Sequence, residues 1–429
     1  MLSIESCVMK ISYKILPLFV ALATTDAFAT DGYFAHGYGV KSQGMGGVGI
    51  ALPQDALAAA TNPAGMGLIG DRLDFGATWF RPIRESEIVG NLGGAAVNGT
   101  YKANETKDFI IPEFGYNRVI NPELSLGVSV YGNGGMNTDY NKAIPLFDGT
   151  GTHKAGIDLI QLFVAPTVAW KISPSNTIGV AVNLAYQRFE AKGLQNFDNS
   201  NYTSSVGNVT NNGHDNSYGA GVHIGWIGQL NDAVTLGVTY QTRTYMTKFD
   251  KYKGLFAQGG SFDVPSSYGV GLAIKATPQL TLAADVTRIN YSEVDSVGNS
   301  SSNLFISGNP LGANNGPGFG WKDVTAVKVG ASYAYDENLI LRAGYNYSSQ
   351  PICSSETLFN ILAPGVVQDH LTLGATWALS NKSELSFSYA HAFENSVNGS
   401  NSIPAGFGGG NANLKMYQDS LGVAYGWKL

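Results

Sequence analysis

The sequence contains few charged residues, almost no cysteine and no long apolar run beyond its first 30 residues. Charged residues make up 14% of the 429, well below the roughly 25% of an average soluble protein. After the N-terminal stretch no run approaches the ~20 apolar residues that a membrane-spanning helix needs. Of the two cysteines, Cys7 lies in that stretch and Cys353 has no intrachain partner once it is removed. These absences exclude a helical membrane protein and a disulfide-built domain.

Residues 1–29 are predicted to form a secretory signal peptide. Lys10 and Lys14 supply positive charge, residues 15–23 supply a short apolar core, and Ala27-Phe28-Ala29 fits an A-x-A cleavage site. The mature chain is then expected to begin at Thr30. Export places the protein outside the cytoplasm.

The chain is rich in glycine and tyrosine, with 54 and 22 residues, and its mean hydropathy is -0.02. A neutral, low-charge composition suits a transmembrane barrel, whose strands alternate lipid-facing apolar and lumen-facing polar residues. A soluble secreted β-protein fits the composition equally well. The net charge of -6 argues against nucleic acid as a partner.

From about residue 71 the hydrophobic pattern has period two, which indicates β-strands. An exported membrane protein without helices must close its strands into a barrel, because lipid offers no partner to an open sheet edge. Apolar rows alternate with small or polar residues at 73–79, 124–130, 234–240, 327–333 and 371–377.

Turn signals of two lengths alternate along residues 71–429. Six are short, such as Asn121-Pro122 and Asn231-Asp232. Seven are long and rich in Gly, Asn and Ser, around 89–107, 137–155, 193–215, 249–262, 293–322, 351–366 and 395–413. This alternation is typical of outer-membrane barrels, with short periplasmic turns and long extracellular loops. It predicts an all-β fold, a transmembrane antiparallel barrel of about fourteen strands.

Residues 30–70 do not follow the period-two pattern that indicates strands. A glycine cluster at residues 44–49 is followed by the small-residue run 55–60 and by Asn62-Pro63. Glycine allows close backbone packing, and proline keeps the residue before it out of the helical region. We therefore predict a compact N-terminal plug, or hatch, inside the lumen. Its key residues are Gly44, Gly46, Gly47, Asn62, Pro63 and Ala64.

A second glycine cluster, Gly132-Asn133-Gly134-Gly135, interrupts a good strand pattern. Glycine within a strand often marks a bulge or a bend. In a barrel wall such a kink breaks the ladder and leaves a gap between strands. The alternative is that the strand ends at Tyr131 and a loop begins.

These motifs together resemble one known family. Gln43-Gly44-Met45-Gly46-Gly47, Thr61-Asn62-Pro63-Ala64-Gly65, residues 131–140, Leu341-Arg342-Ala343-Gly344-Tyr345 and residues 369–374 are similar, in this order, to FadL-type outer-membrane transporters. The resemblance implies a fourteen-stranded barrel with an N-terminal hatch. It implies passive transport of long-chain fatty acids or aromatic hydrocarbons by hatch movement, with lateral exit at the kink formed by Gly132, Asn133, Gly134 and Gly135.

Candidate ligand-binding residues follow from strand parity and from apolar positions near the strand tops. The alternation of inward and outward side chains along each strand places Arg243, Lys328 and Arg342 on the lumen side, where they could pair with a ligand carboxylate. An apolar ligand needs an apolar groove, for which Phe34 and Phe163 are candidates, with Phe109, Phe256 and Phe319 nearby. The six histidines show no metal-ligand spacing and no catalytic motif is evident. No enzyme activity, metal or cofactor is expected.

The predicted setting is a Gram-negative outer membrane, with the protein as a monomer. The partners expected there are a hydrophobic small molecule, outer-membrane lipid and lipopolysaccharide, and the barrel-assembly machinery. That machinery usually recognises a terminal aromatic residue, whereas this chain ends Trp427-Lys428-Leu429. Two alternatives stay open: a structural or adhesive barrel with a permanently closed plug, and a general porin.

Overall fold

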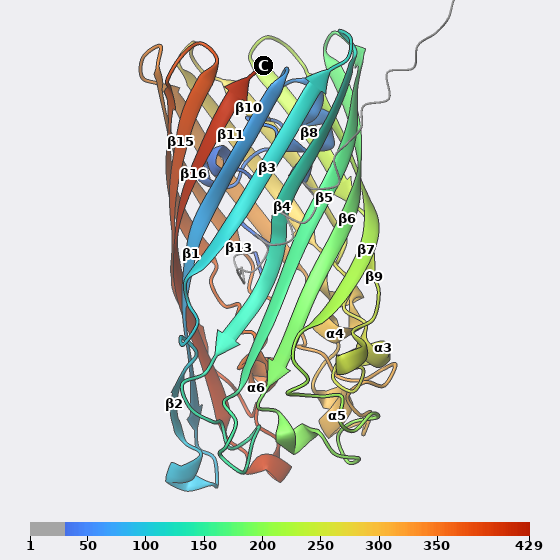
Figure 1. The fold of residues 1–429 in the computed structure, drawn as a ribbon. Helices are drawn as coiled ribbons and strands as arrows, with labels where there is room; N and C mark the ends of the chain where they lie inside the picture. The colour runs from blue at the N-terminus through green and yellow to red at the C-terminus, as the bar shows by residue number, and fades with distance from the viewer. Residues whose placement is uncertain (1–30) are drawn as a thin grey trace, which may run out of the picture.

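The computed structural model describes residues 31–429, and the predicted signal peptide lies outside them. Fourteen antiparallel strands form a closed ring, and each pairs with the wall strand that follows it in the chain (Figure 1). The last strand closes on the first, from Arg72↔Lys428 to Val89↔Asn411. The predicted fold class is confirmed.

The wall strands have the following bounds: β1 Arg72–Val89, β3 Phe109–Val119, β4 Leu124–Asp139, β5 Gly156–Ser173, β6 Asn176–Lys192, β7 Asp215–Gln229, β8 Val234–Gln241, β10 Ser267–Lys275, β11 Leu280–Ile289, β12 Val324–Ala334, β13 Leu339–Ser348, β14 Asp369–Ala378, β15 Ser383–Val397 and β16 Asn411–Lys428. Two short strands, β2 Gly99–Lys102 and β9 Tyr245–Met246, pair with β1 and β7. The connections alternate between short and long as the sequence predicts.

Side chains alternate between the two faces of the wall. Phe75, Leu373 and Val423 point outward and are 51%, 53% and 46% exposed. Ser129 and Thr372 point inward and are fully buried. A one-residue slip in register would exchange the two sets, so this alternation fixes the pairing of the strands.

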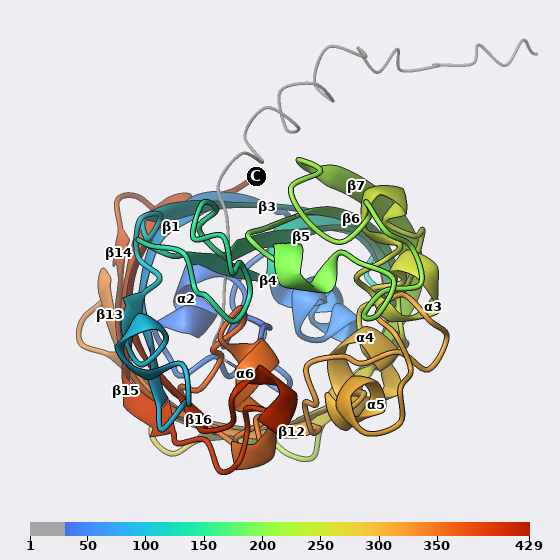
Figure 2. The same ribbon diagram turned by 90° about the horizontal axis from the view of Figure 1, so that it is seen from below.

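The long connections gather at one end of the barrel and carry short helices (Figure 2). No helix in the described part of the chain is long and apolar enough to cross a membrane. The helices at this end are η3 Gly94–Ala96, η4 Gln195–Phe197, η5 Asp250–Tyr252, α3 Ala257–Gly260, η6 Tyr291–Glu293, α4 Asp295–Gly298, α5 Ser302–Phe305, η7 Ser354–Glu356, α6 Thr357–Asn360 and η8 Ala405–Phe407.

Residues 31–70, the N-terminal segment, lie within the ring of strands (Figure 2). The segment contains α2 Val40–Gln43, η1 Ala58–Ala60 and η2 Pro63–Gly67. Side chains from several strands bond to its backbone: Asp285 accepts from Gly49 N at 2.7 Å, and Ser129 Oγ donates to Ala56 O at 2.6 Å.

Wall glycines leave the space that the N-terminal segment fills. A Cβ on Gly344 would lie 2.2 Å from Gly46 N, and one on Gly237 would lie 2.3 Å from Ile50 O. Real Cβ atoms do not approach backbone this closely, so a larger residue would displace the segment. The wall glycines in such contact include Gly115, Gly179, Gly225, Gly237, Gly271, Gly330, Gly344 and Gly374.

Candidate functional site

Strand β4 changes its pairing halfway along its length. Its register against β5 shifts by one residue between Gly132 and Gly134, which leaves Asn133 as a bulge. The strand then continues to Asp139, still paired with β5. The alternative in which the strand ends at Tyr131 is therefore wrong.

The ladder between β3 and β4 is interrupted from residue 131 of β4, shortly before the bulge. It ends at Phe114↔Val130, although β3 extends to Phe109 and β4 extends to Asp139. The gap is closed again toward the long loops, where Asn104 bridges to Asp139. We call the interrupted stretch, residues 109–113 of β3 and 131–138 of β4, the side window. Figure 1 shows β4 diverging from β3 here.

The N-terminal segment occupies the edge of β4 that β3 has left. Phe34 bridges antiparallel to Gly134, Gly135 N donates to Tyr33 O at 3.0 Å, and Ala35 N donates to Asn133 O at 3.2 Å. A Cβ on Gly134 would lie 2.0 Å from Tyr33 O. Glycine at position 134 is therefore what allows residues 33–35 to lie against the strand.

The start of the same segment is attached to the opposite part of the wall. Lys328 Nζ of β12 lies 3.0 Å from Asp31 Oδ2, and Asn346 Nδ2 of β13 donates to Asp31 Oδ1 at 2.9 Å. The Tyr291 hydroxyl donates to Asp31 O at 2.6 Å and accepts from Tyr33 N at 3.1 Å. Residues 31–35 thus link β12 and β13 to the side window, through a tight turn in which Asp31 N donates to Phe34 O at 3.0 Å.

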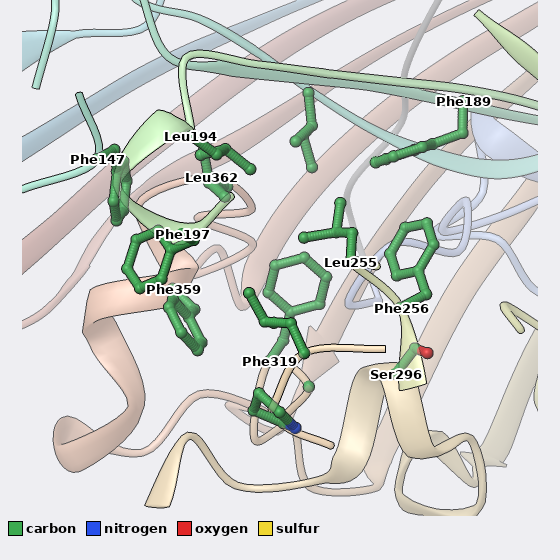
Figure 3. A pocket seen from close by; sticks show the side chains of 14 residues that line it. Phe147, Phe189, Leu194, Phe197, Leu255, Phe256, Ser296, Phe319, Phe359 and Leu362 are labelled. Atoms are coloured by element: carbon green, nitrogen blue, oxygen red, sulfur yellow. The ribbon is translucent and has the colours of Figure 1, made fainter. Parts of the chain in front are cut away.

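An apolar pocket lies among the long loops, and we call it the mouth pocket (Figure 3). It holds about 550 Å³ of empty space, including its open side, and Ser296 supplies the only polar side chain among its lining residues. Tyr252 packs edge-on against Phe189 of its wall, with ring centroids 4.8 Å apart, and burial raises the pKa of Tyr252 to about 12, so its hydroxyl stays neutral. The lining residues are Phe147, Ile157, Phe189, Leu194, Phe197, Leu255, Phe256, Ser296, Leu311, Pro317, Gly318, Phe319, Phe359 and Leu362.

Aromatic rings connect the mouth pocket to the side window. Phe256 of the pocket lies 4.8 Å from Phe262, whose ring lies 6.1 Å from that of Tyr33. On a second side Phe319 lies 6.4 Å from Trp321, which lies 5.8 Å from Tyr33. Both paths end on Tyr33, the residue whose carbonyl is bonded to β4.

The predicted inward cations already have protein partners. Arg243 lies 2.8 Å from Asp263, Lys328 forms the ion pair with Asp31 described above, and Arg342 Nε donates to Gln54 Oε1 at 2.8 Å. A ligand carboxylate at any of them would have to displace a protein group. Their assignment to ligand binding stays a prediction.

The two predicted aromatic contacts lie apart from the mouth pocket. Phe34 is 5% exposed and lines an inner cavity with about 580 Å³ of empty space, including its open side, which also contacts Asp285 and Lys328. Phe163 is fully buried and packs on Tyr131 of β4 with ring centroids 5.7 Å apart. Both residues stand close to the side window, where their role in binding is untested.

Asn62 ties two turns of the N-terminal segment to the wall. Its Oδ1 accepts from Ala64 N at 3.1 Å, which caps the short helix that Pro63 begins. Its Nδ2 donates to Ile50 O at 2.8 Å and to Trp226 O of β7 at 3.2 Å. The extended conformation at Asn62, with φ −155° and ψ 108°, is the one that the following proline favours.

The predicted hatch glycines lie where backbone meets backbone. A Cβ on Gly47 would lie 1.8 Å from His36 O within the segment. One on Gly44 would lie 2.8 Å from the backbone of β14, and one on Gly46, where φ is +72°, would lie 2.8 Å from a carbonyl oxygen of β12. All three positions show close approach, and Gly46 and Gly47 add a positive φ that glycine permits.

Sequence reasoning missed most of the mouth pocket. Phe256 and Phe319 had been noted as apolar positions, whereas Phe147, Phe197 and Phe359 had not. A usable signal was present for Phe197, which is a large apolar residue in a connection otherwise rich in Gly, Asn and Ser. Among residues 31–429 no three His, Cys, Asp or Glu side chains are grouped so as to hold a metal ion.

A closed antiparallel ring with an apolar outer face and a segment within its lumen defines a β-barrel of the outer-membrane class. The sequence matches the family described as outer membrane protein transport protein (OMPP1/FadL/TodX) over residues 20–426. The chain belongs to this family and is a β-barrel of the outer membrane.

Solved structures share the fold at low sequence identity. The toluene transporter TodX of P. putida has a TM-score of 0.68 at 17% identity, with 92% of this chain and 99% of that chain covered. A FadL homologue of Pseudomonas aeruginosa has a TM-score of 0.69 at 15% identity, with the same coverage. The toluene transporter TbuX of Ralstonia pickettii has a TM-score of 0.63 at 16% identity, covering 91% and 98%.

A curated relative covers only part of the chain. It is an uncharacterized protein in the phosphoenolpyruvate carboxykinase gene 5' region of Chlorobium limicola, 36% identical over 76 residues. The match spans 17% of this chain and 37% of that relative.

Proposed function

We propose that this protein lets small hydrophobic molecules cross the outer membrane passively, by capture in the mouth pocket and lateral exit at the side window. The observation that carries the proposal is the continuous line of aromatic rings from Phe256 through Phe262 to Tyr33. Two of the structurally similar proteins are named as toluene transporters, which supports the same class of ligand.

The lateral route follows from the physics of an apolar solute. Moving such a molecule from an apolar pocket into water costs free energy, about 25 cal/mol per Å² of apolar surface. A path through the wall delivers it to the bilayer without that step. The inner end of the barrel instead holds the polar and charged contacts of residues 40–66.

The gate in this proposal is the stretch Tyr33–Ala35. Two main-chain hydrogen bonds hold it to β4, and each contributes about 0.5–1.5 kcal/mol net. Its release frees the edge of β4 and withdraws Tyr33 from the end of the aromatic path. Residues 40–66 need not move, so the hatch movement is confined to its first few residues.

Two other functions compete with transport. A structural or adhesive barrel would keep Tyr33–Ala35 permanently in place, and a general porin would need an open aqueous lumen. The lumen is filled by residues 31–70, which disfavours the porin. Uptake and conductance measurements separate the three.

The test measures uptake of labelled toluene and labelled oleate in cells that lack their own transporter, with and without this protein. A Cys353→Ser background carries Ala35→Cys and Asn133→Cys, neighbouring positions across the segment–β4 contact. We expect uptake in the reduced state, loss of uptake on oxidation and recovery with reductant, while each single-cysteine variant stays active.

Absence of uptake for both ligands contradicts the transport function. Uptake that oxidation does not change, although the disulfide is shown to form, contradicts the gate and keeps the transport. A large ohmic conductance in planar bilayers supports the porin instead.

A further inference from the structure

Lys328 of β12 holds the start of the N-terminal segment from the inner face of the wall. Its Nζ lies 3.0 Å from Asp31 Oδ2 and donates to His36 O at 2.7 Å. The lysine is 8% exposed and the aspartate is 1% exposed. A buried charge is costly unless a partner of opposite sign stays beside it. Any opening that withdraws Asp31 therefore leaves Lys328 in need of another carboxylate.

Asp31 belongs to the same short unit as the gate residues Tyr33–Ala35. Its backbone N donates to Phe34 O at 3.0 Å, and the two residues form an antiparallel bridge across the tight turn. The Tyr291 hydroxyl bonds to both of them, because it donates to Asp31 O at 2.6 Å and accepts from Phe34 N at 3.2 Å. A movement of Phe34 away from β4 is therefore passed on to Asp31.

A second carboxylate, that of Asp285 on β11, lies beside Lys328. The register of the two antiparallel strands places Asp285 and Lys328 directly opposite each other. Residues in such a pair have Cβ atoms about 4.5–5.5 Å apart, a distance that the flexible four-carbon stem of a lysine spans. Both side chains line the inner cavity that Asp31 and Phe34 also contact.

Asp285 has one oxygen atom without a partner. Its Oδ2 accepts from Gly49 N at 2.7 Å and from Ile50 N at 3.0 Å, whereas its Oδ1 accepts no hydrogen bond in the described chain. The side chain is 2% exposed. An unsatisfied acceptor in a buried position lowers stability, and the nearest cation across the ladder is Lys328.

The inner cavity thus holds one lysine and two carboxylates. Among the described residues that line it, Lys328 is the only lysine or arginine, and Asp31 and Asp285 are the only acids. The remaining basic side chain there, His223, bonds through Nε2 to Thr239 Oγ1 at 2.6 Å. The lysine can pair closely with one of the two acids, and in the structure it pairs with Asp31.

We propose that Lys328 is a switch with two positions, paired with Asp31 while Tyr33–Ala35 lie on β4 and paired with Asp285 when they leave it. The second ion pair offsets the loss of the first, so the gate opens without leaving a buried lysine unpaired. This describes how the gate of the proposed function is regulated and rests on that gate, whereas the exchange of partners itself requires no transported ligand.

The experiment measures hydrogen exchange at residues 31–36 by mass spectrometry, on the purified full-length protein in lipid nanodiscs. The exchange rate reports how often this stretch opens. The variants are Asp285→Asn, Lys328→Met and the double variant. Asparagine keeps an oxygen for the two backbone N–H groups of residues 49 and 50 and removes the charge. Heat-modifiable migration in gels confirms folding of each variant.

The matched control is Glu113→Gln. Glu113 is also a buried inward carboxylate that accepts from the backbone of the N-terminal segment, in this case from Val40 N at 3.0 Å. It lies on β3 and does not line the inner cavity. Its neutralisation removes a comparable charge without touching the proposed switch.

We expect Asp285→Asn to slow exchange at residues 31–36 at least about tenfold, because the open state loses its charge-assisted bond. A purely structural role of Asp285 predicts the opposite sign, since weaker bonds to Gly49 and Ile50 loosen the segment. In the Lys328→Met background Asp285→Asn should leave this exchange unchanged, and Glu113→Gln should not slow it.

Exchange at residues 31–36 that is equal to wild type or faster in Asp285→Asn overturns the proposal. Slowing that persists in the double variant, relative to Lys328→Met alone, overturns it as well, because the effect then does not pass through the lysine. Slowing of the same size in Glu113→Gln would show that loss of any inward carboxylate suffices, and would also contradict the switch.

The exchange and uptake results are separable. Slowed exchange that depends on Lys328, with no uptake of toluene or oleate in cells, supports the switch and contradicts the proposed function. Uptake by the wild-type protein, with exchange in Asp285→Asn equal to wild type, supports transport and contradicts the switch.

Discussion

The N-terminal segment is held in two different ways along its length. Residues 40–66 are bonded around the ring by charged and polar side chains, with an ionic cluster of Lys41, Arg72, Asp74 and Glu384 at its centre. Residues 31–38 begin with a tight turn, in which Asp31 N donates to Phe34 O, and are held mainly by backbone bonds to β4, one tyrosine hydroxyl and the ion pair of Asp31.

The two modes of attachment indicate which part of the segment is suited to move. Many polar contacts to several strands must break together before residues 40–66 can shift, whereas Tyr33–Ala35 leave β4 with the loss of two hydrogen bonds. Local opening with a small free energy is the property that gates require. Residues 40–66 therefore form the fixed part of the segment, and Tyr33–Ala35 form the part that can be released. Three substitutions test this contrast.

The largest effect is expected from Glu384→Gln. Glu384 contacts both Lys41 and Arg72 in a largely buried setting, so its neutralisation leaves buried cations undercompensated. Breaking a buried pair in this way costs about 3–5 kcal/mol. Urea unfolding in lipid vesicles, followed by tryptophan fluorescence, should show that loss. The control Glu394→Gln removes a pair with Lys415 at 3.5 Å that is about half exposed, and should change stability by less than about 1 kcal/mol.

A smaller effect is expected from Asn62→Ala. The substitution removes the cap on Ala64 N and leaves Ile50 O without its side-chain donor. A lost cap costs about 1 kcal/mol and an unsatisfied buried acceptor costs about as much again. The same unfolding assay should report a loss of about 2 kcal/mol. An Asn338→Ala variant, altered in an exposed short turn, is the control, and equal stability of the two variants would contradict the role of Asn62.

The smallest effect on stability, and the most local one, is expected from Gly134→Ala. The added Cβ would lie 2.0 Å from Tyr33 O, so residues 33–35 should leave β4. Hydrogen exchange read by mass spectrometry should show about tenfold faster exchange at residues 31–36, the equivalent of ~1.4 kcal/mol, with residues 40–66 unchanged. At Gly406 an added Cβ meets no atom within 4 Å, so Gly406→Ala is the control. Faster exchange throughout both parts would show that the segment moves as one body.

The wall could be predicted from the sequence because its rules are local. Period-two rows such as 371–377 fix which side chains face outward, and the alternation of short and long connections fixes the order of strands. Asn62 beside Pro63 could be assigned an extended conformation for the same reason. Each of these inferences uses residues within a few positions of one another.

The candidate site depends on contacts that no local rule reveals. Tyr33 and Gly134 are about a hundred residues apart and meet because the barrel closes around the segment. Strand parity correctly turns Lys328 inward, but it cannot show that Asp31 already pairs with it.

The seam between β1 and β16 has a consequence for the order of assembly. Residues 31–70 are synthesised before the wall strands. Their contacts nevertheless include strands made late, because Gly46 N bonds to Thr372 Oγ1 of β14, which lies 326 positions later. Contacts of such sequence separation form slowly, because a long loop must close before they contribute. The contacts of the N-terminal segment are therefore completed only when the wall strands are in place. A truncation that removes β16 leaves β1 without its partner strand, so the barrel cannot close around the segment.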